Sequence, residues 1–150
     1  MPQEPSQFNL QRFLDAQADT YGQARSELAA GKKRSHWMWF IFPQIHGLGS
    51  SPMAQHFAIA GLDEAVAYLN HPILGARLRE CTELVNAVQG RSVSEIFGDP
   101  DDLKFHSSVT LFAEAAAKSD SQSNADNQVF SDAILKYFAG KGDQATLARL

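Results

Sequence analysis

The sequence predicts a mainly α-helical protein folded as a single compact domain of about six to eight helices. Apolar residues recur at three- and four-residue steps along most of the chain, which is the spacing of one helix face. Helix-start signals precede several of these stretches, at Ser51-Pro52, Ser92 and Asp99-Pro100. No stretch alternates apolar and polar residues convincingly, as a half-buried strand would.

Length and composition indicate one ordinary domain. The chain has 150 residues, 44% of them hydrophobic and 20% charged, which suffices for one core without disulfides. We expect this domain over residues 8–150, after a loose leader of residues 1–7. The formal charge of −4 argues against a duplex-DNA partner. The longest strongly apolar run, residues 37–42, is far too short to span a membrane, and no secretory signal is visible, so a cytoplasmic location is expected.

Apart from the segment of residues 32–44, four helices are predicted in the first ninety residues, over residues 9–30, 52–59, 63–70 and 72–90. Gly31 ends the first of them, and Ser51 caps the second with proline in its first turn. Asp63 is expected to cap the third. The fourth carries a stripe of apolar residues that includes Leu78 and Cys81, so a buried cysteine is expected rather than a nucleophile.

Further helices are predicted in the second half of the chain. Ser92 and Glu95 fit a capping box for a single helical turn. Asp99-Pro100 opens a helix that is expected to run to about residue 117. Residues 118–127 are polar and are predicted to form a mobile surface loop. The last amphipathic helix stops at Gly140, and a final short helix is expected after Asp143.

The segment of residues 32–44 contains both tryptophans, three of the thirteen basic residues and a histidine. Its aromatic and β-branched residues favour a strand, whereas Ser35 as a cap and Pro43 as a terminator favour a short buried helix. The helical neighbours favour the helix. Trp39 and Phe42 are expected in the core, because large aromatic side chains dominate core burial.

The same segment is the candidate functional site. Buried charge is costly, so we expect the basic residues and His36 to face a pocket. Lys33 and Arg34 would neutralise the charge of a phosphate, and Trp37 would stack on a planar ring. His36, the candidate catalytic residue, would donate or shuttle a proton. The expected ligand-binding residues are Lys33, Arg34, Trp37, Gln44, Gly47, Gly49 and Ser51. No metal and no cofactor are expected, because no spacing brings His46, His56 and His106 together.

The run from Lys33 to Gln44, followed by Gly47-Leu48-Gly49, resembles a bacterial family of unknown function, domain-of-unknown-function family 1810, often labelled "calpastatin". The resemblance continues through residues 68–78, 101–112 and 136–138 and so covers residues 8–150. It implies a compact, mainly helical cytoplasmic domain of no settled activity. The calpastatin label looks like a misnomer, because an inhibitor of that kind is disordered and this composition is not.

Residues 50–57 also remotely resemble NADAR domains, helical domains that act on ADP-ribose-type glycosidic linkages. Met53 stands where that class carries a glutamate for acid–base chemistry. The resemblance therefore implies a nucleotide-like ligand more than it implies hydrolysis.

Two hypotheses follow. In the first, the domain binds, with or without processing, a phosphorylated nucleotide-like or ADP-ribose-like small molecule. In the second, it is a non-catalytic protein-interaction or homodimerisation module. A concave pocket lined by His36, Trp37 and Gln44 would favour the first, whereas burial of these side chains in the core or in a dimer interface would favour the second.

Overall fold

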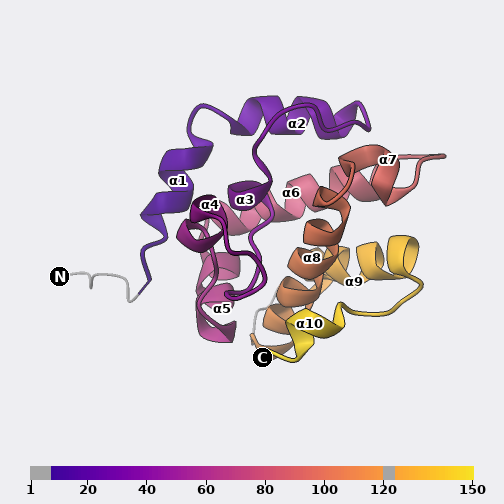
Figure 1. Cartoon of the computed structure of the whole chain (residues 1–150). Coiled ribbons are helices and arrows are strands. Elements are labelled where there is room, and N and C mark those ends of the chain that lie inside the picture. The colour runs from indigo at the N-terminus through magenta and orange to yellow at the C-terminus, as the bar shows by residue number, and fades with distance from the viewer. Residues whose placement is uncertain (1–7, 120–123) are drawn as a thin grey trace.

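The computed structural model describes residues 8–119 and 124–150 (Figure 1). In these residues the chain forms ten helices, six of them at least seven residues long, and no strand beyond an isolated parallel bridge between Ile45 and Ile59. The helices are α1 (Gln11–Gln17), α2 (Tyr21–Ala29), α3 (Met38–Ile41), α4 (Pro52–His56), α5 (Leu62–Asn70), α6 (Leu74–Ala87), α7 (Val93–Phe97), α8 (Asp101–Lys118), α9 (Asn124–Phe138) and α10 (Gln144–Leu147). The predicted all-α single domain is confirmed. The expected leader of residues 1–7 lies outside the described residues.

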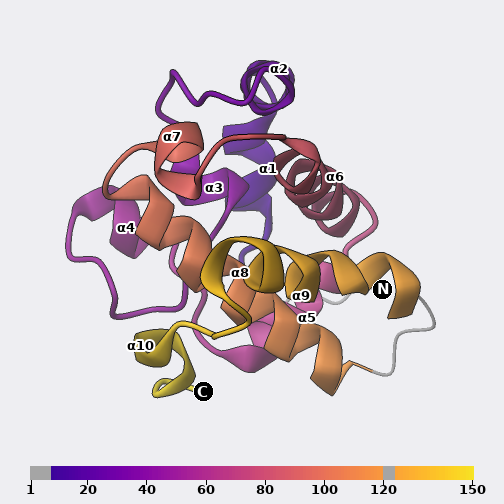
Figure 2. The same cartoon turned by 90° about the vertical axis from the view of Figure 1, so that its right-hand side faces the viewer.

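Helices α6 and α8 organise the fold. Helix α8 contacts α5, α7, α9 and α10, and α6 contacts α2, α5 and α9. In Figure 2, α9 crosses in front of α8, and α10 lies beside the C-terminus below them. The short helices α3 and α4 lie on the other side of α8 from α9. Segments from the two halves of the chain thus meet around α8.

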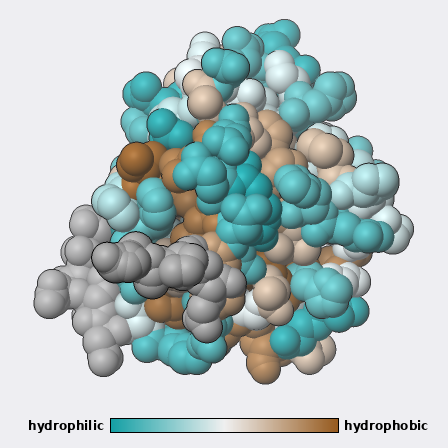
Figure 3. Space-filling model, turned by 90° about the vertical axis from the view of Figure 1, so that its left-hand side faces the viewer, coloured by the Kyte–Doolittle hydropathy of each residue, from teal (hydrophilic) through white to brown (hydrophobic). Residues whose placement is uncertain are grey.

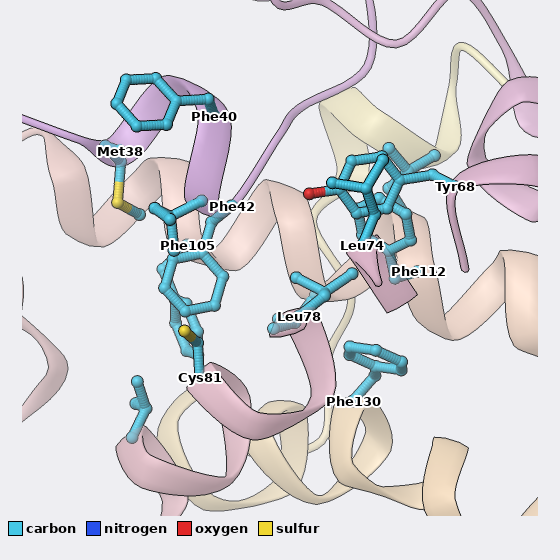
Figure 4. Close-up of a cluster of buried hydrophobic side chains, with 14 of the residues drawn as sticks. Met38, Phe40, Phe42, Tyr68, Leu74, Leu78, Cys81, Phe105, Phe112 and Phe130 are labelled. Atoms are coloured by element: carbon cyan, nitrogen blue, oxygen red, sulfur yellow. The ribbon is translucent and has the colours of Figure 1, made fainter. Parts of the chain in front are cut away.

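The core is built where the apolar stripe of α6 faces α8 and α9. Leu78 and Cys81 are at most 2% exposed, and Cys81 lies next to Phe105 of α8 (Figure 4). Phe42, which follows α3, meets Phe105 edge-on with ring centroids 5.1 Å apart. Burial raises the pKa of the Cys81 thiol to about 12. Cys81 is therefore a core residue, as expected, and not a nucleophile.

Several predicted helix signals are confirmed. Ser51 caps α4 by accepting a hydrogen bond from the Ala54 backbone N–H (3.1 Å). Ser92 and Glu95 form the capping box of α7, and Asp143 caps α10. The segment whose structure the sequence left open contains the four-residue helix α3.

The helix expected over residues 9–30 is instead two helices, with a break at residues 18–20. The break turns the chain so that α1 and α2 both face the core. The buried amide of Gln17, the last residue of α1, supports this turn by donating to the Phe40 carbonyl oxygen (2.7 Å) and to the Tyr68 hydroxyl (3.2 Å). Apolar spacing continues across the break, so it could not reveal the bend.

Other boundaries also differ from the predictions. Helix α4 ends at His56 rather than at residue 59, and α6 spans Leu74–Ala87 rather than residues 72–90. Gly61, and not Asp63, is the N-cap of α5, and Asp63 lies in the first turn, where it pairs with Lys118 (2.8 Å). Of the polar stretch expected to be a loop, Lys118 ends α8 and residues 124–127 begin α9. Residues 120–123 of that stretch lie outside the described residues.

Hydrophilic side chains cover most of the face shown in Figure 3, and hydrophobic residues appear between them in smaller patches. Such a mixture is ordinary for a folded domain, because large parts of any protein surface are apolar. Within residues 8–119 and 124–150, no helix combines the length and the apolar character needed to cross a membrane.

The start of α6 should make stability depend on pH. The Nδ1 atom of His71 accepts hydrogen bonds from the backbone N–H groups of Ile73 (3.1 Å) and Leu74 (3.2 Å). Burial lowers the pKa of His71 from its ordinary value of 6.5, so the unfolded chain takes up a proton more readily than the folded one. We therefore expect stability to fall as the pH drops below about 6.5.

The measurement is the melting temperature of the wild type and of His71→Asn between pH 8 and pH 5. Asparagine can also accept from the helix start, but it does not titrate. We expect the wild type to lose stability relative to the variant as the pH falls. A constant difference between the two proteins over this range would contradict the prediction.

Candidate functional site

The basic and aromatic segment wraps around one buried carboxylate. Glu27, at the end of α2, is only 3% exposed. Its Oε1 atom accepts from the backbone N–H groups of Arg34 (2.7 Å) and Ser35 (3.0 Å) and from Nε1 of Trp37 (2.9 Å). Its Oε2 atom accepts from the Ser35 hydroxyl (2.6 Å) and from the Gln23 amide (2.6 Å). Glu27 thereby holds residues 34–37 against the core.

These donors decide the charge of Glu27. Burial by itself raises the pKa of the carboxyl, but the hydrogen bonds from Ser35, Gln23, Arg34 and Trp37 together outweigh it. The pKa of Glu27 falls from its ordinary value of 4.5 to about 2. Glu27 is therefore an anion at neutral pH, held mainly by backbone and side-chain dipoles rather than by a cation.

Two of the predicted ligand-binding side chains, Trp37 and Lys33, are engaged in contacts within the protein. Trp37 is fully buried, so its ring is not accessible to a ligand, and the expectation that it stacks on one is wrong. The Lys33 ammonium pairs with Asp101 (2.8 Å) and lies 5.1 Å from the centre of the Trp37 ring. Because its side chain is 7% exposed and its charge is compensated by Asp101, Lys33 anchors the segment to α8.

The two other predicted site residues of this segment, Arg34 and His36, point away from the core. Arg34 and His36 are exposed, because their neighbours Ser35 and Trp37 turn toward Glu27. Neither lines the cavity described next. The structure thus does not bring His36 together with Gln44, Gly49 and Ser51. These three residues line one cavity, and His36 lies outside it.

A cavity of about 490 Å³ lies between the loop that precedes α4, the start of α8 and the start of α10. This volume falls within the range of small-molecule sites. Three predicted ligand-binding residues, Gln44, Gly49 and Ser51, line it. The remaining polar lining comes from Ser50, Lys104, Ser107 and Asp143, and the apolar lining includes Leu48, Ala54, Leu103 and Ala145.

Lys104 is the cation of this cavity. Its ammonium lies 5.0 Å from the centre of the Trp39 ring and 3.5 Å from Oδ1 of Asp101. Asp101 is shared, because its Oδ2 atom is paired with Lys33 at the shorter distance of 2.8 Å. Lys104 is therefore only loosely paired and retains capacity to bind an anion.

Asp143, which precedes α10, supplies a fixed carboxylate to the lining. Its Oδ2 atom accepts from the Ser107 hydroxyl (3.1 Å) and from the backbone N–H (3.1 Å) and hydroxyl (2.6 Å) of Thr146. Its own N–H donates to the Thr110 hydroxyl (2.9 Å). Within the described part of the chain, Oδ1 makes no hydrogen bond and can accept one from a ligand.

The two predicted glycines occupy the loop beside this cavity. A Cβ atom at Gly49 would lie 2.7 Å from Cβ of Ala54, so only glycine permits the loop to approach α4 this closely. Gly47 has φ +97°, a conformation that side chains other than glycine rarely adopt. Gly47 lines a narrow crevice next to the main cavity rather than the cavity itself.

No three His, Cys, Asp or Glu side chains of residues 8–119 and 124–150 form a group suited to a metal ion. Of the three histidines considered from the sequence, His106 stacks on Phe138 with ring centroids 3.8 Å apart and is hydrogen-bonded to the Lys141 carbonyl oxygen (2.8 Å). His56 meets the Phe57 ring edge-on at 4.6 Å. These two imidazoles pack against neighbouring rings.

Comparison with known proteins supports the resemblance seen in the sequence. The profile described as "Protein of unknown function (DUF1810)" matches residues 7–150. The crystal structure of the conserved hypothetical protein Rv1873 from Mycobacterium tuberculosis is similar, with 54% sequence identity, 97% of this chain and 98% of that chain covered, and a TM-score of 0.88. None of the curated proteins matches the chain.

Proposed function

The chain belongs to the DUF1810 family of proteins of unknown function, and we propose that in this protein the cavity between α4, α8 and α10 binds a phosphorylated, nucleotide-like small molecule. The observation that carries the proposal is the cavity of about 490 Å³, in which a loosely paired lysine and a fixed carboxylate face the same space. Small-molecule sites combine such a volume with a few convergent polar groups.

Each part of a nucleotide has a matching group in the lining. The Lys104 ammonium is suited to a phosphate, because ionised donors bind anionic oxygens strongly. The free Oδ1 of Asp143 is suited to a ribose hydroxyl, since an ionised carboxylate only accepts hydrogen bonds. The side chains of Leu48 and Leu103 offer apolar contact for a base. The proposal concerns binding and gives His36 no catalytic role, because His36 lies outside this lining.

A thermal-shift experiment with AMP, ADP and ADP-ribose tests the proposal. A ligand present at 100 times its Kd adds about 2.7 kcal/mol of stability, which should raise the melting temperature of a domain of this size by roughly 5–10 °C. We expect Lys104→Gln to weaken binding by about tenfold, because a charge-assisted hydrogen bond to the phosphate is lost.

Lys32→Gln is the matched control, because Lys32 is exposed and lies outside the cavity. This variant should respond to the ligands like the wild type. Wild-type protein that shows no shift with any of the three compounds would rule out the proposed function. Equal weakening by both substitutions would show that the effect of Lys104 is one of net charge rather than of position.

A further inference from the structure

A second cation reaches the loop beside the cavity from the end of the chain. Arg149 is exposed and follows α10, where its backbone N–H donates to the Thr146 carbonyl oxygen (3.0 Å). Its guanidinium makes no ion pair and no side-chain hydrogen bond with the described residues. By contrast, the guanidinium groups of Arg12 and Arg25 are paired with carboxylates.

The guanidinium of Arg149 packs against Gly47, in the space that a side chain at position 47 would fill. A Cβ atom at position 47 would lie 2.6 Å from Cζ of Arg149, which is closer than real side chains approach one another. The positive φ of Gly47 excludes most other residues independently. Gly47 therefore lets the guanidinium of Arg149 lie directly on the backbone of the loop.

The loop under Arg149 is also a wall of the cavity. Gly47 lines the narrow crevice together with Gln44, Gly49 and Ala54, and the last three residues line the main cavity as well. Lys104 enters that cavity from α8, on a different element. Lys104 thus lines the cavity from α8, and Arg149 lies against Gly47 in the adjoining loop. Among the described residues, no carboxylate pairs with Arg149.

Resting on the proposed function, we propose that Arg149 binds a second phosphate of the cavity ligand, so that the site selects nucleoside diphosphates over nucleoside monophosphates. The single phosphate of a nucleoside monophosphate needs only the Lys104 ammonium as its partner. A second phosphate has no further lysine in the lining, and a planar guanidinium can bind its oxygens through two parallel hydrogen bonds. Arg149 is in this way a specificity-determining residue.

Calorimetric titration of the full chain with AMP and ADP tests this assignment. We expect the wild type to bind ADP about tenfold more tightly than AMP, which corresponds to one charge-assisted contact. Arg149→Gln should lose this preference while its affinity for AMP stays within about twofold of the wild-type value. Gly47→Ala should also reduce the preference, because the added methyl group displaces the guanidinium without removing its charge.

Arg91→Gln is the control, since Arg91 is also exposed but lies beside Gly31, away from the cavity. It should keep the preference for ADP. Wild type and Arg149→Gln with the same ratio of ADP to AMP affinity would overturn the assignment and leave the proposed function intact. Failure of the wild type to bind either nucleotide would overturn both.

Discussion

Replacing Phe105 with alanine should destabilise the fold by about 3–5 kcal/mol. Phe105 is fully buried. Its ring stacks on Phe97 at 4.8 Å and meets Phe42 edge-on at 5.1 Å and Tyr137 edge-on at 6.4 Å. Truncation therefore removes a contact shared by the segment after α3, by α7 and by α9, and these backbone elements cannot all close on the space left behind.

Urea unfolding at neutral pH measures this effect. Leu103→Ala is the control, because Leu103 is two residues away on the same helix but 61% exposed. Its free energy of unfolding should stay within about 0.5 kcal/mol of the wild-type value. A similar loss in both variants would mean that helix α8 itself, and not the aromatic cluster, is what Phe105→Ala weakens.

Replacing Glu27 with alanine should cost about 3–6 kcal/mol, because the three buried or partly buried N–H groups that donate to its Oε1 atom lose their acceptor at once. These donors are the backbone N–H groups of Arg34 and Ser35 and the indole N–H of Trp37. The segment of residues 34–37 should then detach from α2. Urea unfolding measures the loss, and Glu83→Ala, an exposed site on α6, should leave stability nearly unchanged.

The same carboxylate should add a pH dependence in acid. The pKa of Glu27 is about 2 in the folded protein and 4.5 ordinarily, so the unfolded chain takes up the proton first. The stabilisation that ionised Glu27 contributes to the fold is complete above pH 4.5 and is lost as the pH falls from 4.5 to about 2. It amounts to about 3 kcal/mol, the free energy that such a difference in pKa represents.

Comparison with Glu27→Gln isolates this contribution, because glutamine has the same shape and does not titrate in this range. The advantage of the wild type over the variant should shrink steadily below pH 4.5. An advantage that stays constant down to pH 2.5 would show that the hydrogen bonds do not depend on the charge of Glu27.

Prediction from the sequence worked best where the physical cause is local. A cap depends on a side chain and a backbone N–H a few residues away, so Ser51, Ser92 and Asp143 could be identified as helix starts from their neighbours alone. The apolar stripe of α6 was recognised for the same reason, since residues three and four apart share a helix face.

Prediction failed where a distant group decides the local conformation. The break after α1 depends on the bonds of Gln17 to Phe40 and Tyr68. The roles of Lys33 and Trp37 depend on Asp101 and Glu27. A basic and aromatic segment can surround an external anion or one of the protein's own carboxylates, and its sequence alone does not distinguish the two.

The sequence by itself determined that this protein is helical and where most of its helices begin, and it predicted Gln44, Gly49 and Ser51 as ligand-binding residues. Only the tertiary structure decided that the cavity joins these residues to Lys104 of α8 and to Asp143 before α10. Ser107 and Asp143 come together because α10 packs on α8. Such contacts arise from the burial of whole helix faces, and no pattern within a few residues of either side chain records which distant helix will cover it.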